Sequence, residues 1–220
     1  MPDPDAENRR ARPAPKRLPE KRMKKLIVGM TGASGSIFGI RLLEVLRETD
    51  VEVHLVVSKW AQQTLKHEVD TTLEEVRALA DKTYGPGDMG AAISSGSFVT
   101  DGMIIVPCST RSVAAIAGGL GDHLVHRAAD VVLKERRPLV LVVRETPLSD
   151  IHLENMLKLS RMGVTILPPM PAFYNHPRNV DDIVNHIVAR CLDQFGIEWD
   201  YAKRWDGDMI NRSAKIHRLK

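Results

Sequence analysis

The stretch that decides the fold is Lys24-Lys-Leu-Ile-Val-Gly-Met-Thr-Gly-Ala-Ser-Gly-Ser36. An apolar run of strand length, Leu26 to Met30, gives way to small residues, and a helix-like pattern begins at Ile37. A strand that turns at once into a helix gathers backbone N–H groups at one point, where the helix dipole adds partial positive charge. The stretch therefore predicts a strand, a tight turn and a helix whose start suits a phosphate group.

This turn does not identify a ligand by itself. Gly29, Gly32 and Gly35 are spaced three apart, which is neither the G-x-G-x-x-G pattern of dinucleotide folds nor a P-loop. A tight turn that binds nothing stays an open alternative. The second expected strand ends in Ser58-Lys59 rather than in the Asp or Glu that holds the ribose of NAD. This difference favours a smaller phosphorylated cofactor such as FMN.

Composition excludes several classes of protein. The chain has 220 residues, of which 43% are hydrophobic, which is enough for one domain with a sizeable core. The net charge of +3 is small and much of the excess lies at the two ends, so no nucleic-acid surface is predicted. The sequence shows no membrane-spanning apolar run and no signal-peptide core. Cys108 and Cys191 lack CxxC spacing, so we expect a cytoplasmic protein without disulfides or structural zinc.

The chain divides into three expected segments. Residues 1–22 are rich in proline and charge and predict a flexible tail, residues 23–206 the folded domain, and residues 207–220 a basic C-terminal tail. Residues 83–100 are expected to be a long loop. Strands alternate with helices and are expected at about 25–30, 51–57, 102–106, 139–143 and 164–167. This alternation predicts an α/β, Rossmann-like fold, in which helices cover both faces of a parallel sheet in three αβα layers.

Polar turns follow the expected strands. Ligands of such sheets bind beyond the carboxyl ends of the strands, where the turns at 31–36 and 108–112 are rich in hydroxyl groups or glycine. Arg144 after the fourth strand could pair with an anion in bidentate fashion, and Glu145 beside it could transfer a proton. No single turn is specific, but their convergence predicts one pocket for a phosphate or a flavin.

Three other features are interpreted as structural. Cys108 could be a nucleophile, but cysteines at strand ends are more often buried packing residues. His123 and His126 lie three apart without a convincing third ligand, so no metal site is predicted. Asp181-Asp182 is expected to start the last helix, where acidic residues favour the dipole.

Several longer motifs occur in order along residues 24–206. They are Gly29-Met-Thr-Gly-Ala-Ser-Gly35, Pro107-Cys-Ser109, Arg127-Ala-Ala-Asp-Val-Val-Leu-Lys-Glu-Arg-Arg-Pro138, Val143-Arg-Glu-Thr-Pro-Leu148, His152-Leu-Glu-Asn-Met156 and Pro171-Ala-Phe-Tyr-Asn-His-Pro177. Together they closely resemble the UbiX family of flavin prenyltransferases, whose relatives include the B subunits of non-oxidative hydroxyarylic acid decarboxylases. The resemblance implies the flavoprotein (HFCD-type) variant of the Rossmann-like fold.

The resemblance also implies an activity. Such an enzyme is a metal-independent transferase that joins a dimethylallyl group from dimethylallyl monophosphate to N5 and C6 of reduced FMN. The product, prenylated FMN, serves UbiD-type decarboxylases, which are the implied partners, and the family forms ring-like homo-oligomers, here expected to be dodecamers. Two alternatives stay open: a decarboxylase subunit that uses bound FMN to act on aromatic acids, and an FMN carrier protein.

Matching the motifs residue by residue implies a set of site residues. The flavin-binding set is Gly32, Ala33, Ser34, Ser58, Ser109, Thr110, Arg111, Ser112 and Arg144. The catalytic set is Glu145, Lys134 and Tyr174, and the prenyl phosphate is expected to meet Tyr174, Arg190, Lys134 and Arg127. Because no metal motif is present, such donors must stabilise the departing phosphate.

Two further sequence features bear on the predicted site. Lys134 and Arg190 lie far in sequence from the strand-end turns, so a neighbouring subunit is expected to complete the site. Met89 stands where several family members carry a tryptophan near the flavin, which affects how the prenyl group would pack.

Overall fold

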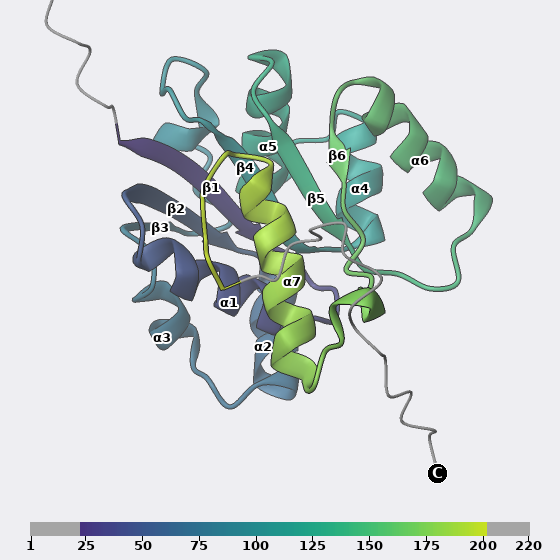
Figure 1. Ribbon diagram of the computed structural model, residues 1–220. Helices are drawn as coiled ribbons and strands as arrows, with labels where there is room; N and C mark the ends of the chain where they lie inside the picture. Colours follow the sequence, from purple (N-terminus) through teal and green to yellow (C-terminus); the bar gives the residue numbers. More distant parts are fainter. Residues whose placement is uncertain (1–22, 202–220) are drawn as a thin grey trace, which may run out of the picture.

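The computed structural model describes residues 23–201 of the chain. The expected tails, 1–22 and 207–220, and residues 202–206 of the expected domain lie outside the described residues. Six parallel strands form one sheet in the order β3-β2-β1-β4-β5-β6 (Figure 1). The strands are β1 (Lys24–Met30), β2 (Val51–Val57), β3 (Lys82–Tyr84), β4 (Gly102–Cys108), β5 (Leu139–Val143) and β6 (Thr165–Ile166).

Helices cover both faces of this sheet. They are α1 (Ser36–Arg47), α2 (Lys59–Glu68), α3 (Leu73–Arg77), α4 (Thr110–Ala117), α5 (Leu124–Lys134), α6 (Asp150–Arg161) and α7 (Val180–Asp193), with short 3-10 turns η1 (Ala92–Ser94) and η2 (Phe173–Asn175). Side chains of α1, α2, α3 and α7 build the core on one face, and those of α4, α5 and α6 build it on the other. The predicted three-layer αβα fold is confirmed.

The central strand shows why the sequence gives these layers. Leu26, Val28 and Met30 of β1 join the core on the α1 face, whereas Ile27 joins the core on the α5 face. Successive strand residues point to opposite faces, so a strand covered on both sides must be apolar throughout. Fully burying each of these large side chains contributes about 1.5–3 kcal/mol.

The chain changes direction across the sheet between β1 and β4. Strands β1, β2 and β3 succeed one another toward one edge, and β4, β5 and β6 toward the other. Helices α1 and α4, which follow β1 and β4, therefore pack on opposite faces. Such a switch point opens a crevice at the carboxyl ends of the two strands, and ligands of this fold class bind there.

The prediction of a continuous loop over residues 83–100 is wrong at its start. Lys82–Tyr84 forms the edge strand β3, and His54 and Val56 of β2 pair with Lys82 and Tyr84. A strand of three residues is too short to show an alternating pattern. A tertiary contact holds this strand in place: Nδ1 of the buried His54 ring lies 2.8 Å from the Tyr84 hydroxyl. The sheet therefore has six strands instead of the predicted five.

Helix starts carry local capping signals. Thr72 and Glu75 form a reciprocal capping box at α3, and Ser109 caps α4 by accepting the N–H of Ser112. Asp181 and Asp182 lie in the first turn of α7, as predicted. Across residues 23–201, no helix is both long and apolar enough to cross a membrane.

Candidate active site at the switch point

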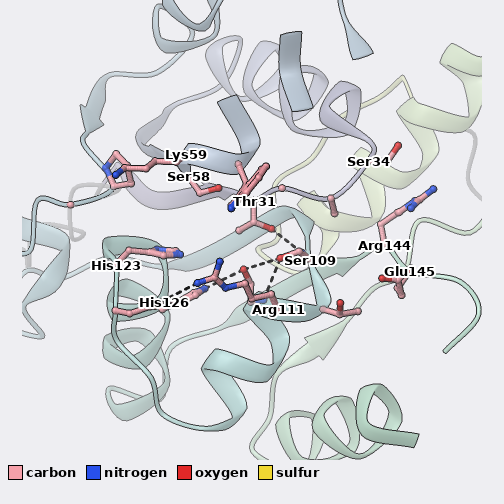
Figure 2. A pocket seen from close by; sticks show the side chains of 18 residues that line it. Thr31, Ser34, Ser58, Lys59, Ser109, Arg111, His123, His126, Arg144 and Glu145 are labelled. Atoms are coloured by element: carbon pink, nitrogen blue, oxygen red, sulfur yellow. Dashed lines mark hydrogen bonds and ion pairs between the residues drawn. The ribbon is translucent and has the colours of Figure 1, made fainter. Parts of the chain in front are cut away.

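A cavity of about 620 Å³ lies beyond the carboxyl ends of β1, β2, β4 and β5 and is called the switch-point cavity below (Figure 2). It brings together all nine residues of the predicted flavin-binding set and one of the predicted catalytic residues. They are Gly32, Ala33, Ser34, Ser58, Ser109, Thr110, Arg111, Ser112, Arg144 and Glu145. These residues come from four separate turns, so only the sheet topology makes them neighbours.

The first turn is held between two strand ends. The Thr31 hydroxyl donates to the carbonyl of Pro107 at 2.9 Å and accepts the N–H of Ser109 at 2.8 Å, which ties the end of β1 to the end of β4. Gly32 approaches α2 so closely that an added Cβ would lie 2.5 Å from the Cβ of Trp60. Only glycine leaves room for this approach.

The start of α1 is closed by a carboxylate of the chain itself. Glu68, the last residue of α2, accepts the N–H groups of Gly35 at 2.9 Å and Ser36 at 2.8 Å. Burial raises the pKa of Glu68, but hydrogen bonds from Ser34, Ser36 and Gly35 outweigh it and hold the pKa below its usual range. The amides of Gly35 and Ser36 therefore bind a carboxylate of the chain itself. No local spacing reveals a contact between residues 32 positions apart.

The second turn rests on a buried histidine. Ser112 receives a hydrogen bond from the Ser109 hydroxyl at 3.1 Å, and its own Oγ lies 3.2 Å from Nε2 of His126. On the other side of the ring, Nδ1 of His126 lies 2.5 Å from Oδ1 of Asp122. The ring is 1% exposed. No local sequence pattern connects His126 or Asp122 to the site, because the contact to Ser112 crosses from α5 to α4.

Asp122, His123 and His126 are also a group of three potential metal ligands. Their donor atoms lie within 4.8 Å of one another, so Asp122 supplies the third ligand that the sequence did not reveal. However, both nitrogens of His126 already have partners, Asp122 and Ser112. We therefore interpret the group as a hydrogen-bond chain. The His123 ring lies against that of His126 with 3.7 Å between centroids, and burial, followed by the neighbouring His126, lowers its pKa.

Arg144 and Glu145 lie at the other end of the cavity from His123 (Figure 2). They follow β5, and the N–H of Arg144 donates to the carbonyl of Cys108 at 3.1 Å, which fixes the position of this turn against β4. Both side chains are exposed. A cation and a carboxylate therefore face the cavity where an anionic ligand can reach them.

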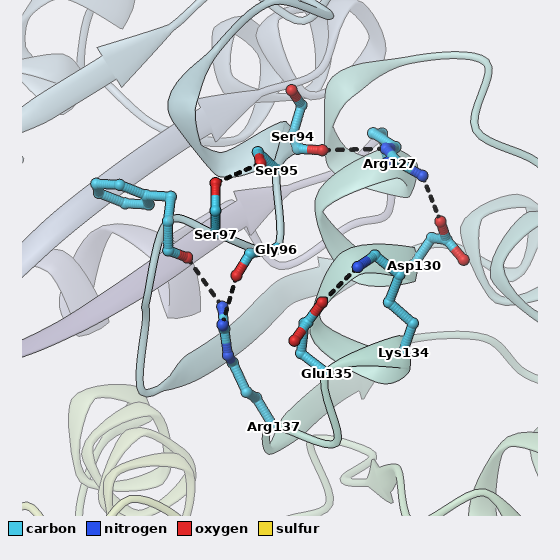
Figure 3. Close-up of polar contacts among 10 residues, drawn as sticks. Ser94, Ser95, Gly96, Ser97, Arg127, Asp130, Lys134, Glu135 and Arg137 are labelled. Atoms are coloured by element: carbon cyan, nitrogen blue, oxygen red, sulfur yellow. Dashed lines mark hydrogen bonds and ion pairs between the residues drawn. The ribbon is translucent and has the colours of Figure 1, made fainter.

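The four residues predicted to hold the prenyl phosphate are not brought to this cavity by the described chain. Lys134 pairs with Glu135, and Arg127 pairs with Asp130 at 2.7 Å and donates to the carbonyl of Ser94 at 3.2 Å (Figure 3). Arg190 on α7 pairs with Asp193 at 2.6 Å, and Tyr174 in η2 is 52% exposed. Three cationic side chains and one phenol thus lie elsewhere on the surface.

Two further sequence interpretations can be compared with the site. Cys108 is fully buried, and burial raises the pKa of its thiol far above the usual range, so it is a packing residue, as predicted, and not a nucleophile. Met89 is 43% exposed and does not line the switch-point cavity, whereas Pro86 and Gly87 of the same loop do.

The fold and the cavity define a class of protein, the Rossmann-like flavoproteins, and comparison with known proteins agrees. Residues 16–192 match the Flavoprotein family. The chain is 63% identical over 183 residues to a probable UbiX-like flavin prenyltransferase of Bacillus subtilis, covering 83% of this chain and 90% of that protein.

Two solved structures are also similar. A dodecameric FMN-dependent UbiX-like decarboxylase from Escherichia coli O157:H7 is 64% identical with a TM-score of 0.82, covering 83% of this chain and all of that chain (100%). AnUbiX (PadA1), solved in complex with FMN and dimethylallyl pyrophosphate, is 52% identical with a TM-score of 0.84, covering 84% of this chain and 99% of that one. The chain belongs to the UbiX family of flavin prenyltransferases.

Proposed function

We propose that this protein transfers a dimethylallyl group to reduced FMN, forming prenylated FMN. The observation that carries the proposal is the switch-point cavity, which collects the whole predicted flavin-binding set together with Glu145. Its volume, about 620 Å³, lies within the range of cofactor pockets. A similar structure binds both FMN and a dimethylallyl phosphate ester, so both substrates suit this family's site.

The chemistry divides between two kinds of residue. As the allylic C–O bond breaks, the phosphate departs with the electron pair and the allylic carbon becomes cationic, so fixed donors must stabilise the leaving charge. Arg144 is such a donor within the cavity. N5 of the reduced flavin bonds to the allylic carbon and loses its proton, and the remaining alkene then gains a proton to give a second cationic carbon. C6 bonds to that carbon and loses its own proton, and Glu145 beside Arg144 serves as a carrier for these protons.

A second copy of the chain completes this site in our proposal. Lys134, Arg127, Tyr174 and Arg190 lie outside the cavity of the described chain, in conflict with their predicted role at the prenyl phosphate. A homo-oligomer resolves this conflict by placing these side chains at the cavity of a neighbour, and we propose a dodecamer because a similar protein is dodecameric. In the oligomer, the cations that pair with Glu135, Asp130 and Asp193 in the described chain then bind the phosphate of the substrate as well.

The finer assignments belong to the same proposal. The prenyl donor is dimethylallyl monophosphate, and the product passes to a UbiD-type decarboxylase. Both cysteines of the described chain are free and buried, which suits a reducing compartment such as the cytoplasm.

The test is anaerobic incubation of the purified protein with reduced FMN and the prenyl donor, followed by mass spectrometry of the flavin. Gain of one prenyl unit supports the transferase. An aromatic acid decarboxylase would instead release carbon dioxide and leave the flavin mass unchanged, and a carrier would only bind FMN. Adding the treated flavin to a UbiD-type decarboxylase without cofactor tests the partner, since only prenylated FMN should activate it.

A further inference from the structure

A series of hydrogen bonds runs along the wall of the switch-point cavity, through the imidazole of His126 to the carboxylate of Asp122, and all four of its residues line the cavity. It runs from Ser109 to Ser112, then to His126 and finally to Asp122. The two serines line the cavity at the start of α4, and His126 reaches them from α5 (Figure 2). A polar ring that is 1% exposed must have partners for both nitrogens, and this one has them.

Asp122 fixes the tautomer of the ring. Its pKa is held below the usual range, chiefly by the hydrogen bond with His126, so the carboxylate is ionised and can only accept. Nδ1 of His126 therefore carries a hydrogen, and in the neutral ring Nε2 must accept one from the Ser112 hydroxyl. Ser109 in turn donates to Ser112. In this arrangement both serine hydroxyls donate toward His126, and neither donates to a ligand in the cavity.

A second proton on His126 reverses this direction. Nε2 then donates to Oγ of Ser112, whose own hydrogen turns toward Ser109, and the hydroxyl of Ser109 becomes free to donate into the cavity. No covalent bond between heavy atoms changes, and the proton comes from solvent. The polarity of the cavity wall thus follows the protonation of His126, whose side chain is 1% exposed.

We propose that His126 is a positioning residue through which FMN binding takes up a proton. FMN offers oxygen acceptors at Ser109, either its phosphate or its ring carbonyls, and acceptors stabilise the arrangement in which Ser109 donates. The inference rests on the proposed function, because it requires FMN in this cavity.

Other charges near His126 set the size of the coupling. The charged or titratable groups nearest to His126 are the carboxylate of Asp122, the stacked ring of His123 and the guanidinium of Arg111, which lies 3.7 Å from Asp122. On the sheet face behind α5, His54 is already bonded to Glu52 and Tyr84, and Cys108 is buried. The remaining charged side chains of the cavity are Lys59, Arg144 and Glu145.

Titration calorimetry tests this coupling. FMN binding is measured in two buffers of different ionisation enthalpy across about pH 6–8, where imidazoles exchange protons, and the difference in observed enthalpy gives the protons taken up. Wild type should take up a fraction of a proton. The uptake should fall toward zero in His126→Gln and Asp122→Asn, with FMN affinity weakened by up to about tenfold, the effect of one lost hydrogen bond. His67→Gln, at an exposed histidine on α2, is the matched control and should match wild type.

The outcomes separate this inference from the proposed function. A wild-type protein that binds no FMN overturns both. A wild-type protein that binds FMN, with the same proton uptake in wild type, Asp122→Asn and His126→Gln, overturns only the role of His126. Because Asp122 is exposed, its variant decides the question even where His126→Gln does not fold. Riboflavin, which lacks the phosphate, identifies the acceptor: uptake that persists assigns the ring, and uptake that disappears assigns the phosphate.

Discussion

The carboxylate of Glu68 accepts the backbone N–H of Ser36 at 2.8 Å, so the end of α2 caps the start of α1. The same carboxylate accepts the N–H of Gly35 at 2.9 Å. An anion at a helix start is stabilised by the free N–H groups and the dipole. The turn that opens the switch-point cavity is therefore shaped by a residue from the next helix, and its charge is already balanced before any ligand binds.

Glu68→Gln should lower the thermal midpoint near neutral pH and lose this effect in acid. Because the folded-state pKa of Glu68 is lowered, its contribution to stability is present above the usual pKa of about 4.3 and is lost as the pH falls through the folded value. Melting curves of wild type and variant should therefore differ at about pH 7 and converge once the pH has fallen through the lowered folded-state pKa of Glu68. Glu198→Gln, at an exposed glutamate, is the control. A difference that persists unchanged in acid would rule out the capping charge.

Gly32→Val should destabilise the fold and abolish FMN binding together. The new Cβ would lie 2.5 Å from that of Trp60 and 3.3 Å from its carbonyl carbon, so the turn or α2 must move, at a cost of about 1–3 kcal/mol. Calorimetric melting and FMN titration measure the two effects. Gly85→Ala, where the added Cβ meets open space, should leave both unchanged. Normal FMN affinity in Gly32→Val would remove this turn from the flavin site.

Much of the fold could be predicted from the sequence because its signals are local. Runs rich in apolar residues mark β1, β2, β4 and β5, and small hydroxyl residues mark several helix starts. The missed element, β3, is three residues long and exists because Tyr84 reaches His54. Pairing of that kind depends on which segments meet in space, and no window of sequence contains it.

Glu145→Gln should retain FMN binding and slow prenyl transfer by on the order of a hundredfold, because the amide cannot carry a proton. Turnover is followed by flavin mass under anaerobic conditions, and binding by titration with FMN. Glu154→Gln, on the exposed surface of α6, is the control with the same change of charge. Near wild-type turnover would exclude Glu145 from proton transfer.

Two inactive variants should restore activity to each other if neighbouring copies share the site. Glu145→Gln damages the cavity and Arg190→Ala removes a cation that the described chain does not bring to it. In randomly mixed oligomers, about one quarter of sites would join an intact cavity to an intact Arg190 from the neighbour. Flavin mass after co-expression measures this recovery. Mixed oligomers as inactive as either variant alone would place both residues in one chain's site.

Part of the lining of the candidate site could be predicted from the sequence, whereas Lys134, Tyr174, Arg190 and Arg127 lie outside it and its internal hydrogen bonds were not predicted. The predicted flavin-binding residues follow strand ends, and strand ends of a parallel sheet meet at one edge, so their convergence follows from the topology. Glu68 and the pair of Asp122 and His126 were missed because they act across helices. Glu, Asp and His are common on solvent-exposed helices, so the presence of these residues alone does not indicate a function.

The most direct test of prenyl transfer is the mass of the flavin after reaction. Folded, FMN-loaded protein is reduced under anaerobic conditions and incubated with dimethylallyl monophosphate, with the diphosphate and the Glu145→Gln variant in parallel. The account predicts a flavin heavier by one prenyl unit, one phosphate released per flavin, and strongly slowed formation in the variant. A flavin whose mass stays unchanged in the wild-type reactions with both donors would contradict it.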